Sequence, residues 1–562
     1  MEQLLKDVLT DALTRAKAAG DLQFDLLPEI AFRRSTDKEH GDFASTLAMQ
    51  LASQAKRAPR DIAQAISKHI QLEHSPVKKV EIAGPGFLNF FINQQYWYEL
   101  LQTIVAQQEN YGRLTIGQQK NVQVEFVSSN PTGPVHVGHG RGAIVGDVMA
   151  SILAYAGYNV QREYYVNDAG AQLERIGRST WCRYMQLHGK DVPMQEDGYQ
   201  GDYVFDIARK IIEQDGDKYV NLPVEETLSF FKKFSCEYVL DWMKADLARF
   251  RVKYDCWFSE QSLYDSGEVL RVIERLKGEG WVYEQDGALW FKSTSAGHED
   301  EKDRVVVRAD GRPTYFASDI AYHDNKFQRG FEKLINVWGA DHHGYVPRLK
   351  GVIKALGHPD ALEVMLVQMV SLLRNGERVS MSTRAGEFVT LAEVLDEVGV
   401  DATRFFFNMR RSDSQLDFDL EVAKQQSKEN PVYYVQYAHA RICSVFREAD
   451  RQGINMPDPS AIDCSRLALP EEMALISELA HFPKVIGISA RDLEPHRVTY
   501  YVQEVAGLFH AYYNLGNKSA QHRVVVTDDL ALTHARMFLL SAIRVVLRNA
   551  LGLLGVSAPE QM

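Results

Sequence analysis

The chain has 562 residues, of which 45% are hydrophobic and 25% are charged, and its formal net charge is −12. This composition is that of a globular protein with about two to four domains, and the acidic charge gives no sign of a nucleic-acid-binding protein. No secretory signal and no membrane span is predicted, so we expect a cytoplasmic protein without a membrane partner.

Residues 1–112 predict a small α+β module. Apolar residues recur at helical spacing from Leu4 to Ala12. The stretch VKKVEIAGPGFLNFFI has the pattern of a strand, a Gly-Pro-Gly turn and a second strand. Further helices are expected around 44–55, 61–69 and 96–107.

Residues 113–400 predict a parallel α/β domain, because strand and helix patterns alternate along them. The domain begins with a predicted strand over 122–127, a helix over 143–157 and a strand over 159–166. These three elements form a right-handed crossover of the nucleotide-binding kind. We therefore expect a Rossmann-like catalytic domain.

Residues 401–562 have long helical periodicities and few strand signals, which predicts an all-α bundle. The five cysteines are scattered without a Cys-x-x-Cys pair, which argues against a disulfide framework and a cysteine-based zinc site. Two adjacent histidines, His342 and His343, rarely bind one ion together, so no metal site is expected there.

The loop between the first strand and its helix contains NPTGPVHVGHGRG, residues 130–142. Glycines at a helix N-terminus let a phosphate approach the backbone N–H groups. His136 and His139 would add donors for the charge that develops during phosphoryl or nucleotidyl transfer. A lone H-x-x-H pair is more often a surface feature, but its place between a strand and a helix favours the functional interpretation.

A second stretch, LLRNGERVSMSTRAG (372–386), combines an Asn-Gly hairpin signal with a loop rich in hydroxyls and arginine. Together, HVGHG and SMSTR resemble the HIGH and KMSKS signatures of class I aminoacyl-tRNA synthetases. Four further features resemble arginyl-tRNA synthetases of the bacterial type: YFASDIAYH, VWGADHHGYVPRLK, MSTRAGEFVTL and a tail similar to their DALR-type anticodon-binding bundle. The resemblance covers essentially the whole chain.

The resemblance implies that arginine and ATP with Mg²⁺ give arginyl-adenylate, and that the arginyl group then moves to the 3′ end of tRNA(Arg). It also implies a monomer with no zinc and no bound prosthetic group, and arginine activation that needs tRNA. The implied catalytic residues are His136, His139, Ser382 and Arg384. The implied ATP-binding residues are His136, Gly138, His139, Gly140, Met381 and Ser382.

Both lysines of the second signature are missing, because Ser380 and Thr383 stand in their places. The cation that meets the pyrophosphate is therefore open, with Arg384 and Arg378 as candidates.

A guanidinium is planar and permanently charged, so a pocket for arginine needs carboxylates. Tyr315 and Asp319 would share one helical face, and Asp341 is our own addition to the family's set. Which carboxylate binds which charged group is left open. The resemblance implies that Glu125, Asn130, His136, Tyr315, Asp319 and Gln368 bind arginine, and we expect Asp341 to join them.

Single-stranded bases are usually read by aromatic and arginine side chains. Core packing of a helical bundle explains about half of such aromatics equally well. By resemblance, the tRNA-binding residues are Phe87 and Asn89 in the first module, and Tyr437, Ala440, Arg447, Tyr512, Tyr513 and Met562 towards the C-terminus.

Two other functions compete with this one. A cofactor-making nucleotidyltransferase shares the histidine signature but has no need of a long helical bundle after the catalytic domain. A non-catalytic tRNA-binding relative explains the missing lysines but has no reason to keep both histidines. Arginine-dependent ATP–pyrophosphate exchange separates all three.

Overall fold

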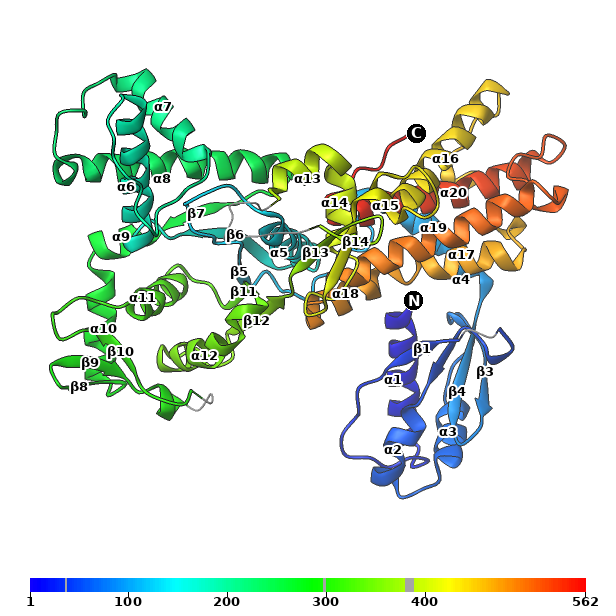
Figure 1. The fold of residues 1–562 in the computed structure, drawn as a ribbon. Coiled ribbons are helices and arrows are strands. Elements are labelled where there is room, and N and C mark those ends of the chain that lie inside the picture. Colours follow the sequence, from blue (N-terminus) through cyan, green and yellow to red (C-terminus); the bar gives the residue numbers. More distant parts are fainter. Residues whose placement is uncertain (36–37, 297–299, 380–388) are drawn as a thin grey trace. The chain divides into compact units, whose positions relative to one another are not determined.

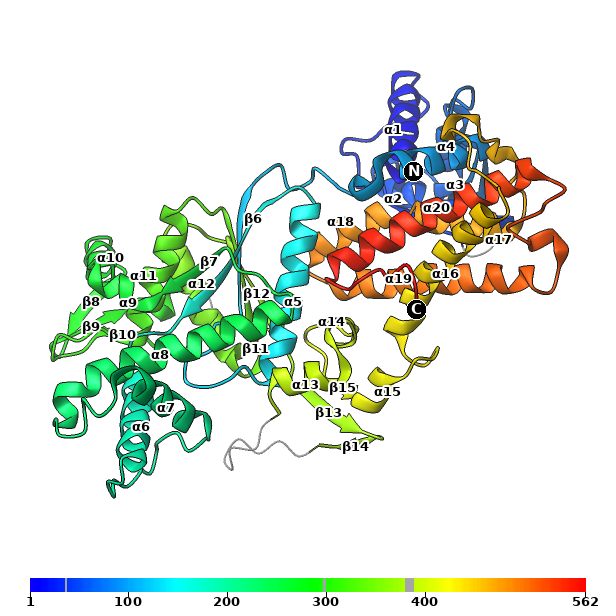
Figure 2. The same ribbon diagram turned by 90° about the horizontal axis from the view of Figure 1, so that it is seen from above.

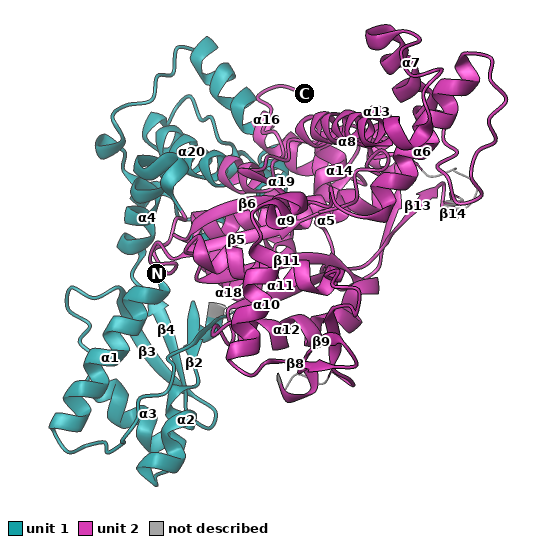
Figure 3. Ribbon diagram, turned by 90° about the vertical axis from the view of Figure 1, so that its left-hand side faces the viewer, with its two compact units in different colours: residues 1–111, 442–482, 507–546 teal, residues 112–441, 483–506, 547–562 magenta. Residues whose placement is uncertain are grey.

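The structure is a computed structural model that describes residues 1–35, 38–296, 300–379 and 389–562. By its internal contacts the chain forms two compact units (Figure 3). Unit 1 consists of residues 1–111, 442–482 and 507–546. Unit 2 consists of residues 112–441, 483–506 and 547–562.

The first 111 residues, in unit 1, contain a four-stranded antiparallel sheet in the order β1-β2-β4-β3 (Figure 1). Its strands are β1 (Phe32–Arg34), β2 (Phe43–Ser45), β3 (Val77–Ala83) and β4 (Phe87–Ile92). Its helices are α1 (Glu2–Ala18), α2 (Leu47–Ala55), α3 (Pro59–Lys68) and α4 (Gln94–Gln107). The predicted α+β module and its hairpin are confirmed. The expected helix over 44–55 begins three residues later, because β2 takes up its start by pairing with β4.

Four helices supply most of the rest of unit 1, and three of them continue into unit 2. They are α16 (Pro431–Arg451), α17 (Pro470–Leu479), α19 (His496–Gly516) and α20 (Leu530–Leu553). By length and composition α20 could cross a membrane, which the sequence analysis did not expect, but 67% of its most apolar window is buried inside the protein. That burial is typical of a core helix.

Unit 2 contains a five-stranded parallel sheet in the order β12-β11-β5-β6-β7 (Figure 2). Its strands are β5 (Asn121–Phe126), β6 (Asn159–Val166), β7 (Cys256–Ser259), β11 (Lys333–Gly339) and β12 (Leu362–Val367). The predicted Rossmann-like domain is confirmed. The strand order reverses at β5, since the chain continues to β6 on one side and later returns to β11 on the other. Such a reversal opens a crevice at the carboxyl ends of the strands.

The helix α5 (Val137–Tyr155) follows β5 and packs against β5, β6 and β11. It is apolar on almost every face, as expected of a helix buried in a core. It begins six residues before the predicted 143–157, so the HVGHG sequence is its first turn and not a loop ahead of it. Glycine lowers helix propensity, which hides this turn from a sequence pattern.

The rest of unit 2 departs from the predicted strand–helix alternation. Three successive helices, α6 (Ala171–Leu187), α7 (Tyr203–Asp215) and α8 (Val224–Arg249), separate β6 from β7. A small antiparallel sheet follows, with strands β8 (Val282–Gln285), β9 (Ala288–Phe291) and β10 (Arg304–Val307). The other helices are α9 (Glu260–Asp265), α10 (Glu268–Gly278), α11 (Tyr315–Gln328), α12 (Val346–Ala355), α13 (Leu391–Val398), α14 (Val400–Phe407), α15 (Leu420–Lys424) and α18 (Phe482–Asp492).

The predicted Asn-Gly hairpin is confirmed. Strands β13 (Val370–Arg374) and β14 (Glu377–Arg378) pair antiparallel, and Asn375 and Gly376 between them have φ angles of 54° and 80°. Two positive φ angles are those of a type I′ turn. A strand that the sequence pattern missed, β15 (Leu416–Asp419), pairs parallel with β13.

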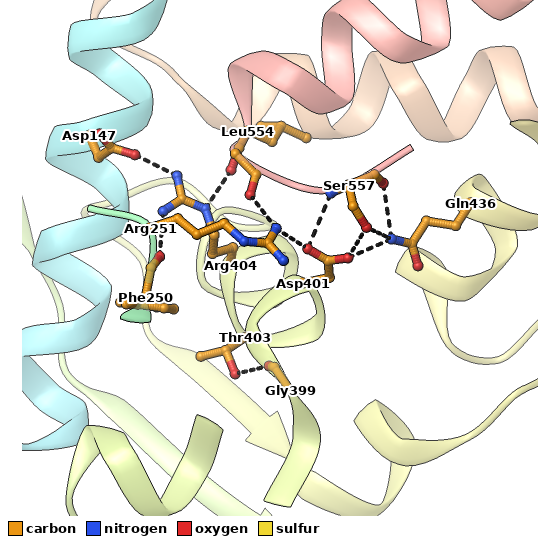
Figure 4. A network of polar contacts seen from close by, with 11 residues as sticks. Asp147, Phe250, Arg251, Gly399, Asp401, Thr403, Arg404, Gln436, Leu554 and Ser557 are labelled. Atoms are coloured by element: carbon orange, nitrogen blue, oxygen red, sulfur yellow. Dashed lines mark hydrogen bonds and ion pairs between the residues drawn. The ribbon is translucent and has the colours of Figure 1, made fainter. Parts of the chain in front are cut away.

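A buried arginine anchors the middle of α5 to the end of the chain (Figure 4). Arg404 on α14 is 1% exposed and donates to the Asp147 carboxylate of α5. It also donates to the carbonyl oxygens of Phe250, at 2.8 Å, and Leu554, at 2.9 Å. Gly555 has no room for a Cβ beside the guanidinium. Because each donor of a buried guanidinium needs an acceptor, these contacts fix α5 to three other segments of unit 2.

Candidate active site

A cavity of about 1470 Å³ lies in unit 2 at the carboxyl ends of β5 and β11, where the strand order reverses. Ligands in open α/β sheets bind at this position. Its wall combines the loop after β5, the first turn of α5, the start of α11 and the 3₁₀ turn Ala340–Tyr345. Among the described residues that line it there is no lysine and no arginine.

The two signature histidines stack on each other at the N-terminus of α5. Their ring centroids are 3.6 Å apart, and His136 Nδ1 accepts a hydrogen bond from the N–H of Gly138 at 3.1 Å, which caps the helix. Burial lowers the pKa of His136. Burial and the neighbouring His136 lower the pKa of His139 to about 3. Both imidazoles are therefore neutral near pH 7, so they can offer phosphate hydrogen bonds but not a positive charge.

The three glycines of this turn have different surroundings. A Cβ on Gly138 would lie 2.9 Å from the His136 ring, so the residue must be small for the imidazole to fold over it. Gly140 is buried against Leu391 and Phe407 and does not line the cavity, which disagrees with its expected contact to ATP. Gly142 lines the cavity and has no atom within 4 Å of its Cβ position.

Two expected arginine ligands lie on α11, as the i, i+4 spacing predicted. Tyr315 stands 56% exposed at the start of the helix, and Asp319 lies one turn further along. The Asp319 side chain faces the cavity but is otherwise enclosed by protein, and it accepts a hydrogen bond from the Tyr345 hydroxyl. Burial raises the pKa of Asp319 to about 6.

Glu125, at the end of β5, forms part of the floor of the cavity. Its Oε1 accepts a hydrogen bond from Ser128 Oγ at 3.0 Å, and its Oε2 lies 2.6 Å from Lys326 Nζ. Sequence reasoning missed Lys326 and Tyr345. A signal for the lysine was present, because residue 326 is seven positions after Asp319 and therefore on the same face of a helix.

The remaining expected arginine ligands lie around the cavity at different depths. Asn130 is half-buried, and Gln368 is exposed with its backbone bonded to Ser412 and Arg141. The side chain of Asp341 is 76% exposed at the rim, with one oxygen 3.5 Å from His342 Nε2. No three His, Cys, Asp or Glu side chains gather as a metal site among the described residues. Met381, Ser382 and Arg384, expected at the ATP, lie outside the described residues.

The expected tRNA-binding residues occur in both units. Phe87 and Arg447 are half-buried in unit 1, and Met562 is 52% exposed in unit 2. On Tyr437, also in unit 2, the ring stacks on that of Tyr433 at 5.9 Å, and the Arg441 guanidinium lies 4.3 Å from its centre. Tyr513 is half-buried beside Phe509 in unit 1.

Three of these residues are more enclosed than expected. Tyr512 is 1% exposed and donates to Glu472 Oε1 at 3.1 Å, so it is a core residue that cannot stack on a base in this structure. Asn89 is 5% exposed in the middle of β4, and Ala440 is 5% exposed on α16. The spacing of aromatic and polar residues on a helix or strand does not reveal which face other elements cover.

Family models match three successive parts of the chain. The arginyl tRNA synthetase N terminal domain matches residues 3–92. The catalytic domain of class I tRNA synthetases (R) matches residues 100–441, and the DALR anticodon binding domain matches residues 435–562.

Curated relatives match over their full length. A protein of Syntrophotalea carbinolica named arginine–tRNA ligase is 51% identical over 563 residues, which is 100% of both chains. One of Caldanaerobacter subterraneus with the same name is 50% identical and covers 99% of this chain and 98% of its own.

Two solved structures are also similar. A Campylobacter jejuni structure named as an arginyl-tRNA synthetase is 34% identical with a TM-score of 0.76, and it covers 84% of this chain and 100% of its own. The Thermus thermophilus arginyl-tRNA synthetase shares the fold, with a TM-score of 0.77 at 24% identity and 100% of both chains covered.

The parallel sheet, the histidine turn at the start of α5 and the helical C-terminal part define a class I aminoacyl-tRNA synthetase. Within that class the chain belongs to the arginyl-tRNA synthetase family, the arginine–tRNA ligases.

Proposed function

We propose that the chain joins arginine to the 3′ end of tRNA(Arg) in two steps, through an arginyl-adenylate made from arginine and ATP. The observation that carries this proposal is that His136 and His139 line the same cavity as the carboxylates Glu125 and Asp319. A nucleotide-binding turn and a pocket for a cation then face the same space, as the joining of arginine to an adenylate requires.

In the first step the first turn of α5 binds ATP. The neutral imidazoles of His136 and His139 donate to the phosphate oxygens, and stabilise the charge that develops as the arginine carboxylate attacks the α-phosphorus and pyrophosphate leaves. By the resemblance of SMSTR to the second signature, Met381, Ser382 and Arg384 are assigned to ATP binding. Mg²⁺ would be held mainly by the ATP phosphates, as it usually is in ATP-binding sites, and would offset part of their negative charge.

Arginine is held at the other end of the cavity. Asp319 and Glu125 receive its cationic groups, while Tyr315, Asn130 and Gln368 line the space between them and the histidines. Asp341 contributes a carboxylate at the rim.

The tRNA is recognised by three segments with separate tasks. Residues 1–112 contact its outer corner through Phe87, residues 113–400 bind its 3′ end, and residues 401–562 bind its anticodon through Tyr437, Arg447 and Tyr513. The protein is a monomer of the cytoplasm and needs no membrane.

The test is ATP–pyrophosphate exchange with each amino acid in turn, with tRNA present, followed by charging of tRNA(Arg). We expect exchange with arginine alone among the standard amino acids. Asp319→Asn is a matched variant that should lose arginine-dependent exchange while keeping the fold. Exchange with another amino acid, or none with arginine, contradicts the proposal.

A further inference from the structure

Lys326 is a buried cation directly behind the wall of the cavity. Its side chain has no exposed surface, and it lies two helical turns after Asp319 on the same helix α11. Its Nζ is 2.6 Å from Glu125 Oε2, 3.3 Å from Asn336 Oδ1 and 4.2 Å from the centre of the Tyr322 ring. A lysine is rarely buried so completely unless its charge is matched.

The Glu125 carboxylate is held on both of its oxygens. Lys326 contacts Oε2, and Ser128 Oγ donates to Oε1 at 3.0 Å while accepting from the N–H of Tyr165 at 3.1 Å. Val127 and Ser128 have φ angles of 69° and 42°. A left-handed backbone is costly for valine, so packing around it must hold this loop in place. The loop brings the serine hydroxyl to the carboxylate.

The charges around the cavity explain why a lysine is needed there. Glu125 and Asp319 both face the same space, and the charge of Glu125 raises the pKa of Asp319 whereas that of Lys326 lowers it. Without the lysine, Glu125 would lose its cationic contact while Asp319 still faces the same cavity. A nearby like charge disfavours the charged form of a carboxyl group, so the two carboxylates would no longer both stay charged as readily.

We propose that Lys326 is a positioning residue for arginine: from behind the cavity wall it holds the Glu125 carboxylate in the orientation that receives a cationic group of the substrate. This inference rests on the proposed function, in which Glu125 belongs to the arginine pocket. Lys326 itself does not line the cavity. It acts on the substrate only through Glu125.

Removing the lysine should also change how arginine binding depends on pH. The pKa of Asp319 rises when the favourable charge of Lys326 is lost, so the protonated, weakly binding form persists to higher pH. Burial, and after it the charge of Lys326, hold the pKa of His323 well below the usual value, so the loss of the lysine raises the pKa of this histidine as well. Several charged or titratable groups surround Lys326 and the two carboxylates of the cavity. Together with those carboxylates they are Glu125, Glu163, Glu260, Asp319, Tyr322, His323, Arg329, Tyr345 and Arg348.

The first experiment compares Lys326→Met with Lys277→Met in tRNA-dependent ATP–pyrophosphate exchange. Lys277 is 40% exposed and contacts Glu284 at 3.5 Å, so its loss removes the same charge from a surface ion pair that does not involve Glu125 or Asp319. For Lys326→Met we expect the arginine KM to rise roughly 10- to 100-fold, as for a broken buried ion pair. The ATP KM should stay near the wild-type value, and the half-maximal pH for arginine use should move up. Lys277→Met should match the wild type.

A double-mutant cycle covers the case in which Lys326→Met does not fold. Glu125→Gln with Lys326→Met replaces the ion pair by two neutral side chains, which usually restores stability. The double variant should show the arginine KM of Glu125→Gln alone, because the lysine works only through the glutamate. Additive losses, or an unchanged arginine KM and pH profile in Lys326→Met, would overturn the inference. A wild-type protein without arginine-dependent exchange contradicts the proposed function instead.

Discussion

At the scale of single residues, the role that we propose for the two signature histidines is hydrogen bonding by neutral imidazoles. His136 accepts from the N–H of Gly138 and stacks on His139, and burial lowers the pKa of both rings. Positive charge for the triphosphate must therefore come from elsewhere. The stacked geometry also means that the two rings hold each other in position.

Replacing His139 by alanine should lower the rate of adenylate formation by roughly 10²- to 10³-fold, the usual effect of losing one preorganised donor. The measurement is single-turnover formation of arginyl-adenylate with tRNA present. His74→Ala is the matched control, since that imidazole is 94% exposed in unit 1. The melting temperature should be close to that of the wild type. A variant that unfolds would show that the turn serves packing alone.

Asp319 predicts a pH dependence of arginine use. Burial raises its pKa to about 6, so in the protein without arginine the Asp319 carboxyl group is mostly neutral below that pH and mostly negative above it. Because only the charged form attracts a cation, kcat/KM for arginine should rise between pH 5 and 7 and then level off. Asp319→Asn should flatten this rise and lower the plateau. Citrulline, which is uncharged, should be used roughly 10⁴-fold less well than arginine.

The raised pKa of Asp319 also predicts that its contribution to the stability of the fold decreases as the pH rises, whereas arginine use increases. A folded-state pKa above the ordinary 3.8 means that Asp319 stabilises the fold while it is protonated. That contribution is lost as the pH rises through about 6. Asp319→Asn should therefore raise the melting temperature at pH 8, although it harms arginine binding. An unchanged or lower melting temperature at that pH would speak against burial as the cause of the shift.

At the scale of elements, the first turn of α5 is stable because of its surroundings. Glycine at 138, 140, 142 and 146 lowers helix propensity. The His136 cap, and the close approach of Gly146 to Phe126 of β5, hold the helix against the sheet. A sequence pattern includes neither contact, which is why the predicted helix began at residue 143.

Two glycine variants separate these contributions. Gly142→Ala meets no atom within 4 Å and should raise the melting temperature, since alanine favours the helix by up to ~1 kcal/mol. Gly146→Ala has no room beside the Phe126 ring and should lower it, by an amount equivalent to about 1–3 kcal/mol. The measurement is thermal unfolding followed by circular dichroism. Equal shifts for both variants would contradict this account of the helix.

The elements that could be predicted are those with a strong local pattern. The strands β5 and β6, the hairpin of β3 and β4 and the type I′ turn at Asn375 all have one. The three-residue strands β1 and β2 and the four-residue β15 exist only through pairing with a partner strand, so a local pattern does not reveal them. In the cavity, Asp319 and Tyr315 were expected from the family resemblance, and helical spacing predicted only that they share one face of a helix. Lys326 and Tyr345 required the fold, since β5, α11 and the 3₁₀ turn meet only in space.

At the scale of the whole molecule, the residues that are expected to bind the anticodon fall into both compact units. Tyr437 and Tyr512 illustrate how differently two such tyrosines can behave. Tyr437→Ala should weaken tRNA binding by about 1–3 kcal/mol, the usual value of one stacked base. Tyr512→Ala should instead lower the melting temperature, because its ring lies in the core. Binding is measured by filter retention, and an unchanged affinity for Tyr437→Ala assigns that ring to packing.

The last prediction concerns the order in which the substrates act. The described wall of the cavity offers ATP two neutral imidazoles and no lysine or arginine, and SMSTR lacks the lysines of its signature. The arrangement that binds triphosphate productively is therefore expected to be a minor state of the free protein. A tRNA that binds this state better than the major one shifts the population towards it.

ATP–pyrophosphate exchange should consequently be close to zero with arginine alone and appear when tRNA(Arg) is added. Because coupling between two binding sites is reciprocal, arginine and ATP together should tighten tRNA binding by the same factor by which tRNA tightens theirs. Both factors are measured by titration, with a non-reactive ATP analogue to prevent turnover. Full exchange without any RNA, or coupling factors close to one, would show that the free protein already holds the productive state, because no shift of population by tRNA is then needed.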